Sequence, residues 1–174
     1  MINTLIIYST TDGQTKLICN KIISENFKQD EVRLCSLADS SKEDLSKYKK
    51  IIIGASIRYG KHNTELIKFT NINKDVINRI KSAFFSVNVV ARKPLKNTPF
   101  TNPYVKKFLN KTLWKPTKVA VFAGKVNYPA YKFLDKYMIK FIMWLTKGPT
   151  DISKSYEFTN WNDVTEFGKI IKEM

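Results

Sequence analysis

The feature that most constrains the fold is an alternation of short apolar runs with longer segments whose apolar residues recur at helical spacing. The runs at 51–53 (Ile-Ile-Ile) and 84–87 (Phe-Phe-Ser-Val) are almost continuously apolar, as expected for strands covered on both faces. Strands that alternate with helices form a parallel sheet with the helices packed against it. We therefore predict an α/β fold with strands at residues 4–8, 32–36, 51–54, 83–87 and 119–123.

Helical spacing appears after the first, third and fifth of these strands. The apolar positions that repeat in this way are Leu17, Ile18, Ile22, Ile23 and Phe27, then Leu66, Phe69, Ile72, Val76, Ile77 and Ile80, and finally Phe133, Leu134, Tyr137, Met138, Phe141, Ile142 and Leu145. Residues 161–174 are predicted to form a closing helix. Because no repeat or low-complexity linker interrupts the pattern, residues 1–174 are expected to form a single domain.

Composition argues against several classes of protein. The longest apolar runs, such as 141–145, are much shorter than the roughly 20 residues of a membrane-spanning helix. The N-terminus lacks the features of a secretory signal, so we expect a cytoplasmic protein. Cys19 and Cys35 form no Cys-x-x-Cys motif, which favours reduced, buried thiols. His62 is the only histidine, so no metal site or Ser-His-Asp triad is predicted, and a lone loop histidine is expected to be solvated.

The formal net charge of +15 is concentrated in one part of the chain. Residues 92–147 hold 13 Lys and Arg against one acid, Asp135, so this segment contributes 13 − 1 = +12. A general lysine bias would enrich lysine everywhere, but it does not explain why acids nearly vanish here. A functional basic face and such a bias both remain open at this point.

Residues 8–15 read Tyr-Ser-Thr-Thr-Asp-Gly-Gln-Thr and join the first strand to the first helix. Ligands of open α/β sheets bind at this edge, and the backbone N–H groups at the start of a helix favour an anion. Hydroxyl groups add neutral donors for phosphate, and Gly13 allows close approach of the backbone. The structural alternative is a capping turn in which Thr11 or Asp12 caps the helix. The pattern favours a phosphate monoester, because the motifs of triphosphatases and dinucleotide-binding proteins are absent.

This hydroxyl-rich loop resembles the FMN phosphate loop of flavodoxins. Residues 54–61 and 86–94 follow the third and fourth strands, and the resemblance implies that these two loops flank the isoalloxazine ring. Tyr59 is a candidate to stack on the face of the ring, and the alternative is that it only covers the core. The resemblance also implies the strand order 2-1-3-4-5, with helices on both faces of the sheet. The cofactor-binding residues that it implies are Ser9, Thr10, Thr11, Asp12, Gly13, Gln14, Thr15, Ser56, Ile57, Arg58, Tyr59, Gly60, Ser86, Val87, Asn88 and Val89.

The strings STTDGQT, IGASIRYGKHN, FFSVNVVARKPLKNTP and AGKVNYPAYKFLDKYMIKFIM resemble one branch of this superfamily, the FMN-containing, quinone-linked protoporphyrinogen dehydrogenases of bacterial haem synthesis. The resemblance covers nearly the whole chain. It implies oxidation of protoporphyrinogen IX, with electrons passed to menaquinone or ubiquinone at the cytoplasmic face of the inner membrane. Arg92, Lys93 and Lys96 are candidate partners of the substrate's propionates. We predict no catalytic base, because none of the side chains is convincing in that role.

Two other functions stay in view. A plain flavodoxin-type electron carrier would share the FMN loops, but flavodoxins are typically acidic, whereas this chain is basic. A nucleic-acid-binding module would need aromatic side chains on a basic surface, and here most aromatic residues lie at core spacing. We therefore expect no nucleic-acid partner. The sequence leaves the oligomeric state open.

Residues 92–117 are predicted to be a basic insertion between the fourth and fifth strands, with a helix of their own. Asn102 and Pro103 form an N-cap and first-turn pair. The predicted apolar stripe is Tyr104, Val105, Phe108, Leu109 and Leu113. A long structured insertion at a ligand edge is usually functional, and the alternative is a surface helix packed on the sheet edge.

Residues 131–147 predict a second unusual helix, in which Lys132, Lys136 and Lys140 fall on one face. The rest of its circumference is so apolar that packing on the sheet is not expected to bury all of it. Apolar surface beside a row of lysines suits a membrane interface. The alternative is an ordinary core helix with a solvated lysine face.

Overall fold

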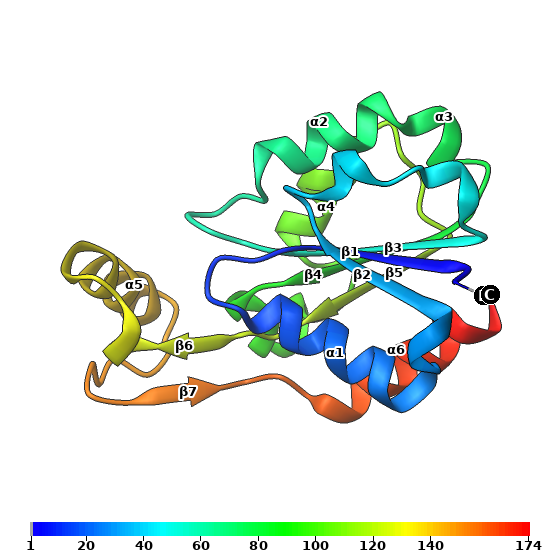
Figure 1. Ribbon diagram of the computed structural model, residues 1–174. Helices are drawn as coiled ribbons and strands as arrows, with labels where there is room; N and C mark the ends of the chain where they lie inside the picture. Colours follow the sequence, from blue (N-terminus) through cyan, green and yellow to red (C-terminus); the bar gives the residue numbers. More distant parts are fainter. Residues whose placement is uncertain (1) are drawn as a thin grey trace.

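The computed structural model describes residues 2–174. Its centre is a parallel sheet in the order β2-β1-β3-β4-β5, as the resemblance to flavodoxins implied (Figure 1). Each predicted strand is present, with ends that differ by at most two residues from those expected. The strands are β1 (Thr4–Ser9), β2 (Val32–Ser36), β3 (Lys50–Ser56), β4 (Lys81–Val87) and β5 (Lys118–Phe122).

Helices cover both faces of this sheet. Five of the α-helices pack on it: α1 (Gln14–Asn26), α2 (Thr64–Ile72), α3 (Lys74–Ile77), α4 (Pro103–Leu109) and α6 (Trp161–Glu173). In Figure 1, α1 and α6 lie below the sheet, and α2, α3 and α4 lie above it. The segment predicted as one helix over 66–80 is divided at Asn73 into α2 and α3.

Successive side chains of the central strands point to opposite faces, so each face has its own core. Leu5 and Ile7 of β1 pack in the core between the sheet and helices α2 and α4. Ile6 packs in the core on the other face, between the sheet and helices α1 and α6. All three side chains have no exposed surface. This explains why the strand sequences are apolar without alternation, since both faces are dry. Cys19 and Cys35 are free and buried, as predicted.

The helix predicted within 92–117 is α4, and Asn102 caps it as expected by accepting hydrogen bonds from the backbone N–H groups of Tyr104 and Val105. Because it joins β4 to the neighbouring parallel β5, α4 is the crossover helix of an ordinary βαβ unit. Val105 and Phe108 lie in the core, so α4 packs on the sheet. Leu113, predicted on the same apolar stripe, is instead exposed beyond the end of the helix.

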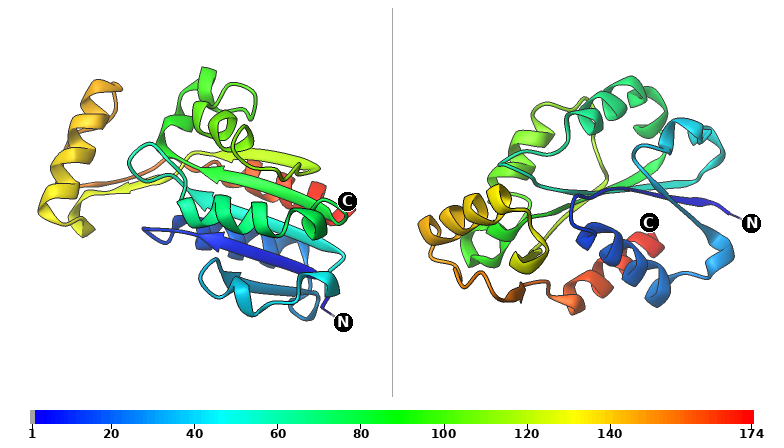
Figure 2. Two further views of the ribbon diagram at one scale, coloured as in Figure 1. Left: turned by 90° about the horizontal axis from the view of Figure 1, so that it is seen from above. Right: turned by 60° about the vertical axis from the view of Figure 1, so that its left-hand side comes forward.

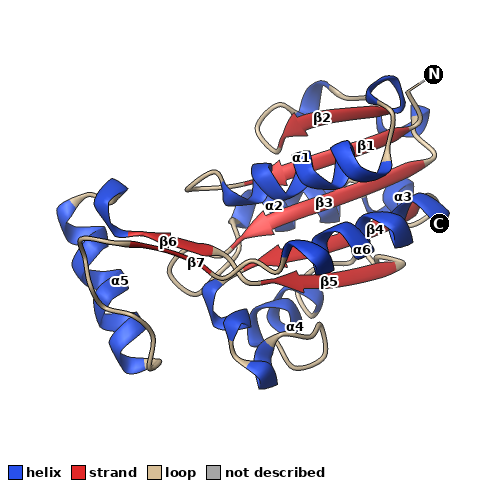
Figure 3. Cartoon of the chain, turned by 90° about the horizontal axis from the view of Figure 1, so that it is seen from below, coloured by secondary structure: helices blue, strands red, loops and turns tan. Residues whose placement is uncertain are grey.

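The element that projects from the domain comes later in the chain. After β5, the short strand β6 (Lys125–Asn127) leads to α5 (Phe133–Leu145), and β7 (Ser155–Glu157) returns antiparallel to β6. Figures 2 and 3 show α5 beyond the carboxyl ends of the parallel strands, at the opposite end of the molecule from the chain termini. We call β6, α5 and β7 the arm. Neither of its strands was predicted, since three residues are too few to show a period.

Within residues 2–174, none of the helices is long and apolar enough to cross a bilayer.

Candidate functional site

The three predicted loops meet at the carboxyl edge of β1, β3 and β4, where they enclose a cavity of about 140 Å³. We call this the central cavity. Twelve of the sixteen predicted cofactor-binding residues line it: Thr10, Thr11, Asp12, Gln14, Ser56, Ile57, Arg58, Tyr59, Gly60, Val87, Asn88 and Val89. Of the other four, Thr15 and Ser86 are fully buried, Gly13 is half-buried, and Ser9 lines a different groove. The loops therefore come together as the resemblance implied.

The sequence did not predict the remaining walls of the central cavity, which are Val90, Tyr104, Gly124, Lys125, Val126, Tyr131, Ile139, Ile142 and Met143. Most of these belong to the arm, and the last three come from α5. Only the conformation of the arm brings its residues to the site, because α5 begins at Phe133, far beyond the end of the third predicted loop at residue 94. The arm adds an apolar wall opposite the polar loops.

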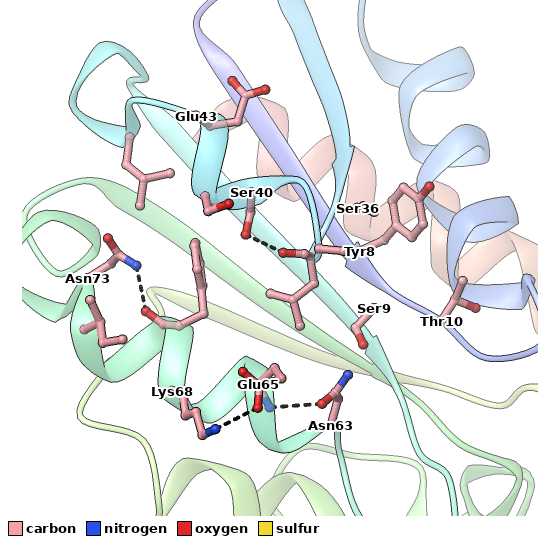
Figure 4. Close-up of a pocket in the computed structure, with 16 residues that line it drawn as sticks. Tyr8, Ser9, Thr10, Ser36, Ser40, Glu43, Asn63, Glu65, Lys68 and Asn73 are labelled. Carbon is pink, nitrogen blue, oxygen red and sulfur yellow. Dashed lines mark hydrogen bonds and ion pairs between the residues drawn. The ribbon is translucent and has the colours of Figure 1, made fainter.

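A larger groove of about 710 Å³ lies beside the central cavity, between the β2–β3 connection and α2 (Figure 4). Only the first predicted loop reaches it, through Ser9 and Thr10. Its lining also includes the carboxylates of Glu43 and Glu65, which disfavour a bound phosphate. For these reasons the smaller central cavity is the better candidate for the flavin ring, although the groove has more volume.

The first loop leads into α1 without a side-chain cap. Gly13 is the N-cap of α1 and has a φ of 85°, which favours glycine, and no side chain caps the helix. The Gly13 N–H instead donates to Thr10 Oγ1, 3.0 Å away. The capping alternative for Thr11 and Asp12 is therefore wrong. A Cβ built on Gly13 would meet no atom within 4 Å, so the space in front of it is open.

Thr15, in the first turn of α1, provides a test of whether a ligand fits here. Its Oγ1 is buried and has no hydrogen-bond partner within residues 2–174. Such an unpaired hydroxyl costs about 1–3 kcal/mol, and buried polar groups are rarely left in this state. Thr15 lies two residues after Gly13 in the first turn of α1, the turn whose backbone N–H groups would bind a phosphate. The loop residues therefore suit the phosphate of FMN.

Hydrogen bonds connect the loops to one another and to the arm. The Ile57 N–H donates to the Val87 carbonyl at 3.0 Å, which joins the second loop to the third. The Gln14 side-chain amide donates to Glu157 Oε1 at 2.7 Å and to Thr159 Oγ1 at 2.9 Å. Gln14, predicted to contact the cofactor, thereby also connects the first loop to the end of β7 and the residues that follow it.

Arg58 joins the first loop to the N-terminal end of α5. Its guanidinium lies 3.2 Å from Asp12 and 2.7 Å from Asp135, and it also packs over the rings of Tyr59 and Tyr131. The hydroxyl of Tyr59 donates to the same Asp135 carboxylate. This hydrogen bond, together with the charge of Arg58, lowers the pKa of the Asp135 carboxyl. The only acid of the basic stretch therefore anchors the arm.

Arg92 forms a similar connection at the other end of α5. Its guanidinium donates to the Val89 carbonyl at 3.0 Å and to the carbonyl and hydroxyl of Thr146 at 2.9 and 3.0 Å. These bonds use the donors that were predicted to bind a propionate, so Arg92 is a structural connection between the third loop and the arm. Lys93 and Lys96, the other predicted substrate ligands, do not line the central cavity.

The third loop is held by a buried polar network that includes His62. The ring Nε2 of His62 lies 2.9 Å from Ser86 Oγ, and the Asn88 side chain donates to the same oxygen at 3.2 Å. The ring packs between Phe84 and Phe108 and is only 5% exposed. The expectation of a solvated histidine was therefore wrong, because two aromatic residues from distant elements enclose the ring. Burial lowers the pKa of His62 to about 4.

Burial of His62 predicts a loss of stability in acid. Because its pKa is about 4 in the folded chain and about 6.5 in an unfolded one, the unfolded state binds the proton more readily between these values. We expect His62 to reduce the free energy of unfolding by about 3 kcal/mol as the pH falls from 6.5 to 4. Urea unfolding over this range, in parallel with His62→Gln, measures the effect. The difference in stability between parent and variant should shrink as the pH falls, and a constant difference would contradict the prediction.

Comparisons with known proteins agree with this geometry. Residues 5–153 match the family described as Flavodoxin domain. The protein is 39% identical over 175 residues to the protoporphyrinogen IX dehydrogenase (quinone) of Escherichia coli K12, covering 98% of this chain and 95% of that one. It is 42% identical over 165 residues to the protein of the same name from Leishmania major, covering 94% of this chain and 71% of the other.

Among solved structures, an archaeal flavodoxin aligns over 99% of this chain and 97% of its own, with a TM-score of 0.50 and 16% identity, which supports the fold. The two curated relatives place the chain more narrowly, since their similarity extends through α4 and the arm. The chain therefore belongs to the flavodoxin-domain family and, within it, to the quinone-dependent protoporphyrinogen IX dehydrogenases.

Proposed function

We propose that this chain oxidises protoporphyrinogen IX to protoporphyrin IX with FMN as its cofactor, and passes the electrons to a membrane quinone. The observation that carries the proposal is the convergence of the three predicted loops on the central cavity, in a chain that is 39–42% identical to enzymes named for this reaction. Membership of the family makes the protein an oxidoreductase.

Several residues would hold the cofactor. The first loop offers backbone N–H groups, the open space at Gly13 and the unpaired hydroxyl of Thr15 for the phosphate. The second and third loops offer the backbone around Ile57, Tyr59 and Asn88 for the ring. When bound, FMN supplies the two-electron redox chemistry.

The residues of the arm give the central cavity a wall suited to a tetrapyrrole. Ile139, Ile142 and Met143 of α5 face polar loops across the cavity, so a macrocycle would meet apolar surface on one side and the cofactor on the other. Asp12, the only carboxylate among the residues that line the cavity, forms an ion pair with Arg58. We assign no side chain as catalytic base.

The arm also offers a surface through which this chain would reach a quinone. Quinone is dissolved in the bilayer, and the exposed face of α5 is the apolar one: Phe133, Leu134, Phe141, Trp144 and Leu145 are 60–78% exposed. In the predicted lysine row, Lys132 is exposed, whereas Lys136 and Lys140 are half-buried, so the solvated lysine face of the alternative is not formed. An ordinary core helix has the reverse arrangement. We therefore propose peripheral association with the cytoplasmic face of the inner membrane through α5.

Turnover by the purified protein tests the proposed reaction. We expect porphyrin fluorescence to appear when protoporphyrinogen IX is supplied under exclusion of oxygen with a quinone, and not without one. Parallel assays with menaquinone and ubiquinone analogues identify the preferred acceptor. A flavodoxin-type electron carrier, the alternative, would bind flavin but release no porphyrin.

Thr15→Val tests the phosphate site separately. We expect the affinity for FMN to fall about tenfold, because a charge-assisted hydrogen bond is lost. The apoprotein should be unchanged or stabilised, since an unpaired buried hydroxyl is removed. The matched control is Thr70→Val, whose buried hydroxyl is paired with Thr112 at 2.7 Å and should cost stability without affecting FMN. Flavin fluorescence titration and urea unfolding give the two readouts, and unchanged FMN affinity in Thr15→Val would contradict the assignment.

A further inference from the structure

A second, smaller cavity adjoins the central one, between the loop after β3 and helix α4. It measures about 80 Å³, and we call it the lysine pocket because Lys61, Lys107 and Lys111 line it. The buried ring of His62 also belongs to its lining. An opening of this size admits a group as large as a carboxylate, since about 10–15 Å³ of such space is enough for a water molecule.

The charge of the lysine pocket is uncompensated. All three lysines are exposed, and none of them forms an ion pair with a carboxylate in the part of the chain that the structure describes. No Asp or Glu is among the lining residues. Lysines near the end of a helix also stabilise its dipole, which would account for Lys107 and Lys111 in α4 and the turn that follows it. It does not account for Lys61, which comes from a different loop.

Two residues are shared between the lysine pocket and the central cavity. Gly60 and Tyr104 line both, and a Cβ added to Gly60 would lie 4.0 Å from Tyr104 Cε1. A planar ligand in the central cavity therefore needs only to pass this pair for a side arm to reach the lysines. The side arms of protoporphyrinogen IX that carry negative charge are its two propionates.

We propose that the lysine pocket binds a propionate carboxylate of the tetrapyrrole, with Lys61, Lys107 and Lys111 as its ligands. This inference rests on the proposed function and assigns to these lysines the role predicted for Arg92, Lys93 and Lys96. It makes the pocket a determinant of specificity, because a porphyrin whose carboxylates are masked lacks the group that the lysines recognise.

Binding of protoporphyrin IX and of its dimethyl ester to the flavin-loaded protein tests the proposal, with porphyrin fluorescence in a neutral detergent as the readout. The parent should prefer the free acid. In the double variant Lys107→Gln/Lys111→Gln, we expect the affinity for the free acid to fall about tenfold and that for the ester to stay the same. Lys61→Gln should show a smaller change of the same kind. In turnover, KM should rise while kcat is retained.

The matched control is Lys106→Gln/Lys115→Gln, which removes the same charge from the same segment at exposed lysines outside the pocket. Equal effects in the two double variants would show that the lysines attract anions only through their general positive charge, and would overturn the inference. Equal binding of the free acid and the dimethyl ester by the parent would also overturn it. Failure of the parent to bind either porphyrin or to oxidise protoporphyrinogen would instead overturn the proposed function, and the inference with it.

Discussion

Replacing Phe133, Leu134, Phe141, Trp144 and Leu145 with Gln should reduce binding of the protein to anionic vesicles by at least about 100-fold. Complete burial of a large apolar side chain is worth about 1.5–3 kcal/mol, so partial burial of five in the interface exceeds the roughly 3 kcal/mol that this ratio requires. None of the five lines the central cavity, so FMN content should be retained. Sedimentation with vesicles and the visible spectrum of the flavin measure the two effects.

The controls separate apolar contact from charge. Ile72→Gln and Ile170→Gln change exposed apolar residues of α2 and α6, which are 80% and 44% exposed, and should leave vesicle binding intact. Lys132→Gln/Lys136→Gln/Lys140→Gln should weaken binding less, and mainly at low salt, because each basic residue near an anionic surface contributes roughly 1 kcal/mol and salt screens it. Equal sedimentation of the parent and the five-residue variant would exclude α5 as the membrane-binding element.

Gly13→Val is expected to have the second large effect, the loss of FMN binding by more than about 100-fold. Gly13 has a φ of 85°, which a β-branched residue adopts only under strain, and its Cβ would enter the open space before the first loop. Backbone strain and a side chain in the phosphate space are two possible causes of this loss, and Gly13→Val alone does not separate them. Gly13→Asn distinguishes them, because Asn tolerates a positive φ but still places a side chain in the space.

We expect both variants to lose FMN and only Gly13→Val to lose stability as an apoprotein. Isothermal titration with FMN and urea unfolding of the apoproteins measure these properties. Retention of full FMN affinity by Gly13→Asn would show that the phosphate binds elsewhere.

The strands, the main helices and the three loops that line the central cavity could be predicted because their signals are local. A buried parallel strand must be apolar on both faces, so the run Ile51 to Ile53 predicts β3 without any information on the residues that pack against it. A loop that binds phosphate needs small and hydroxylated residues at the start of a helix, and these are contiguous in the chain. The N-cap Asn102 was predictable for the same reason, since a cap acts within its own turn.

The remaining features depend on residues that are distant in sequence. His62 is buried because Phe84 and Phe108 enclose its ring, and neither aromatic residue is near it in the chain. Arg92 looks like a free ligand for a carboxylate until the arm brings Thr146 to its guanidinium. The periodicity of α5 showed an apolar face and a lysine row, but a helical pattern does not indicate which face is turned outward.

The sequence alone thus determined the five strands of the parallel sheet, the helices that cover it, the loops at its carboxyl edge and the family to which the chain belongs, because these follow from local periodicity and contiguous motifs. Only the tertiary structure decided that Ile139, Ile142 and Met143 of the arm line the central cavity and that Arg58 and Arg92 secure the two ends of α5. It also decided that Lys61 shares one pocket with Lys107 and Lys111, which are distant from it in the chain. The physical reason is that burial, ion pairs and cavities depend on which residues are close in space, and only the folded structure brings residues together that are distant in the sequence.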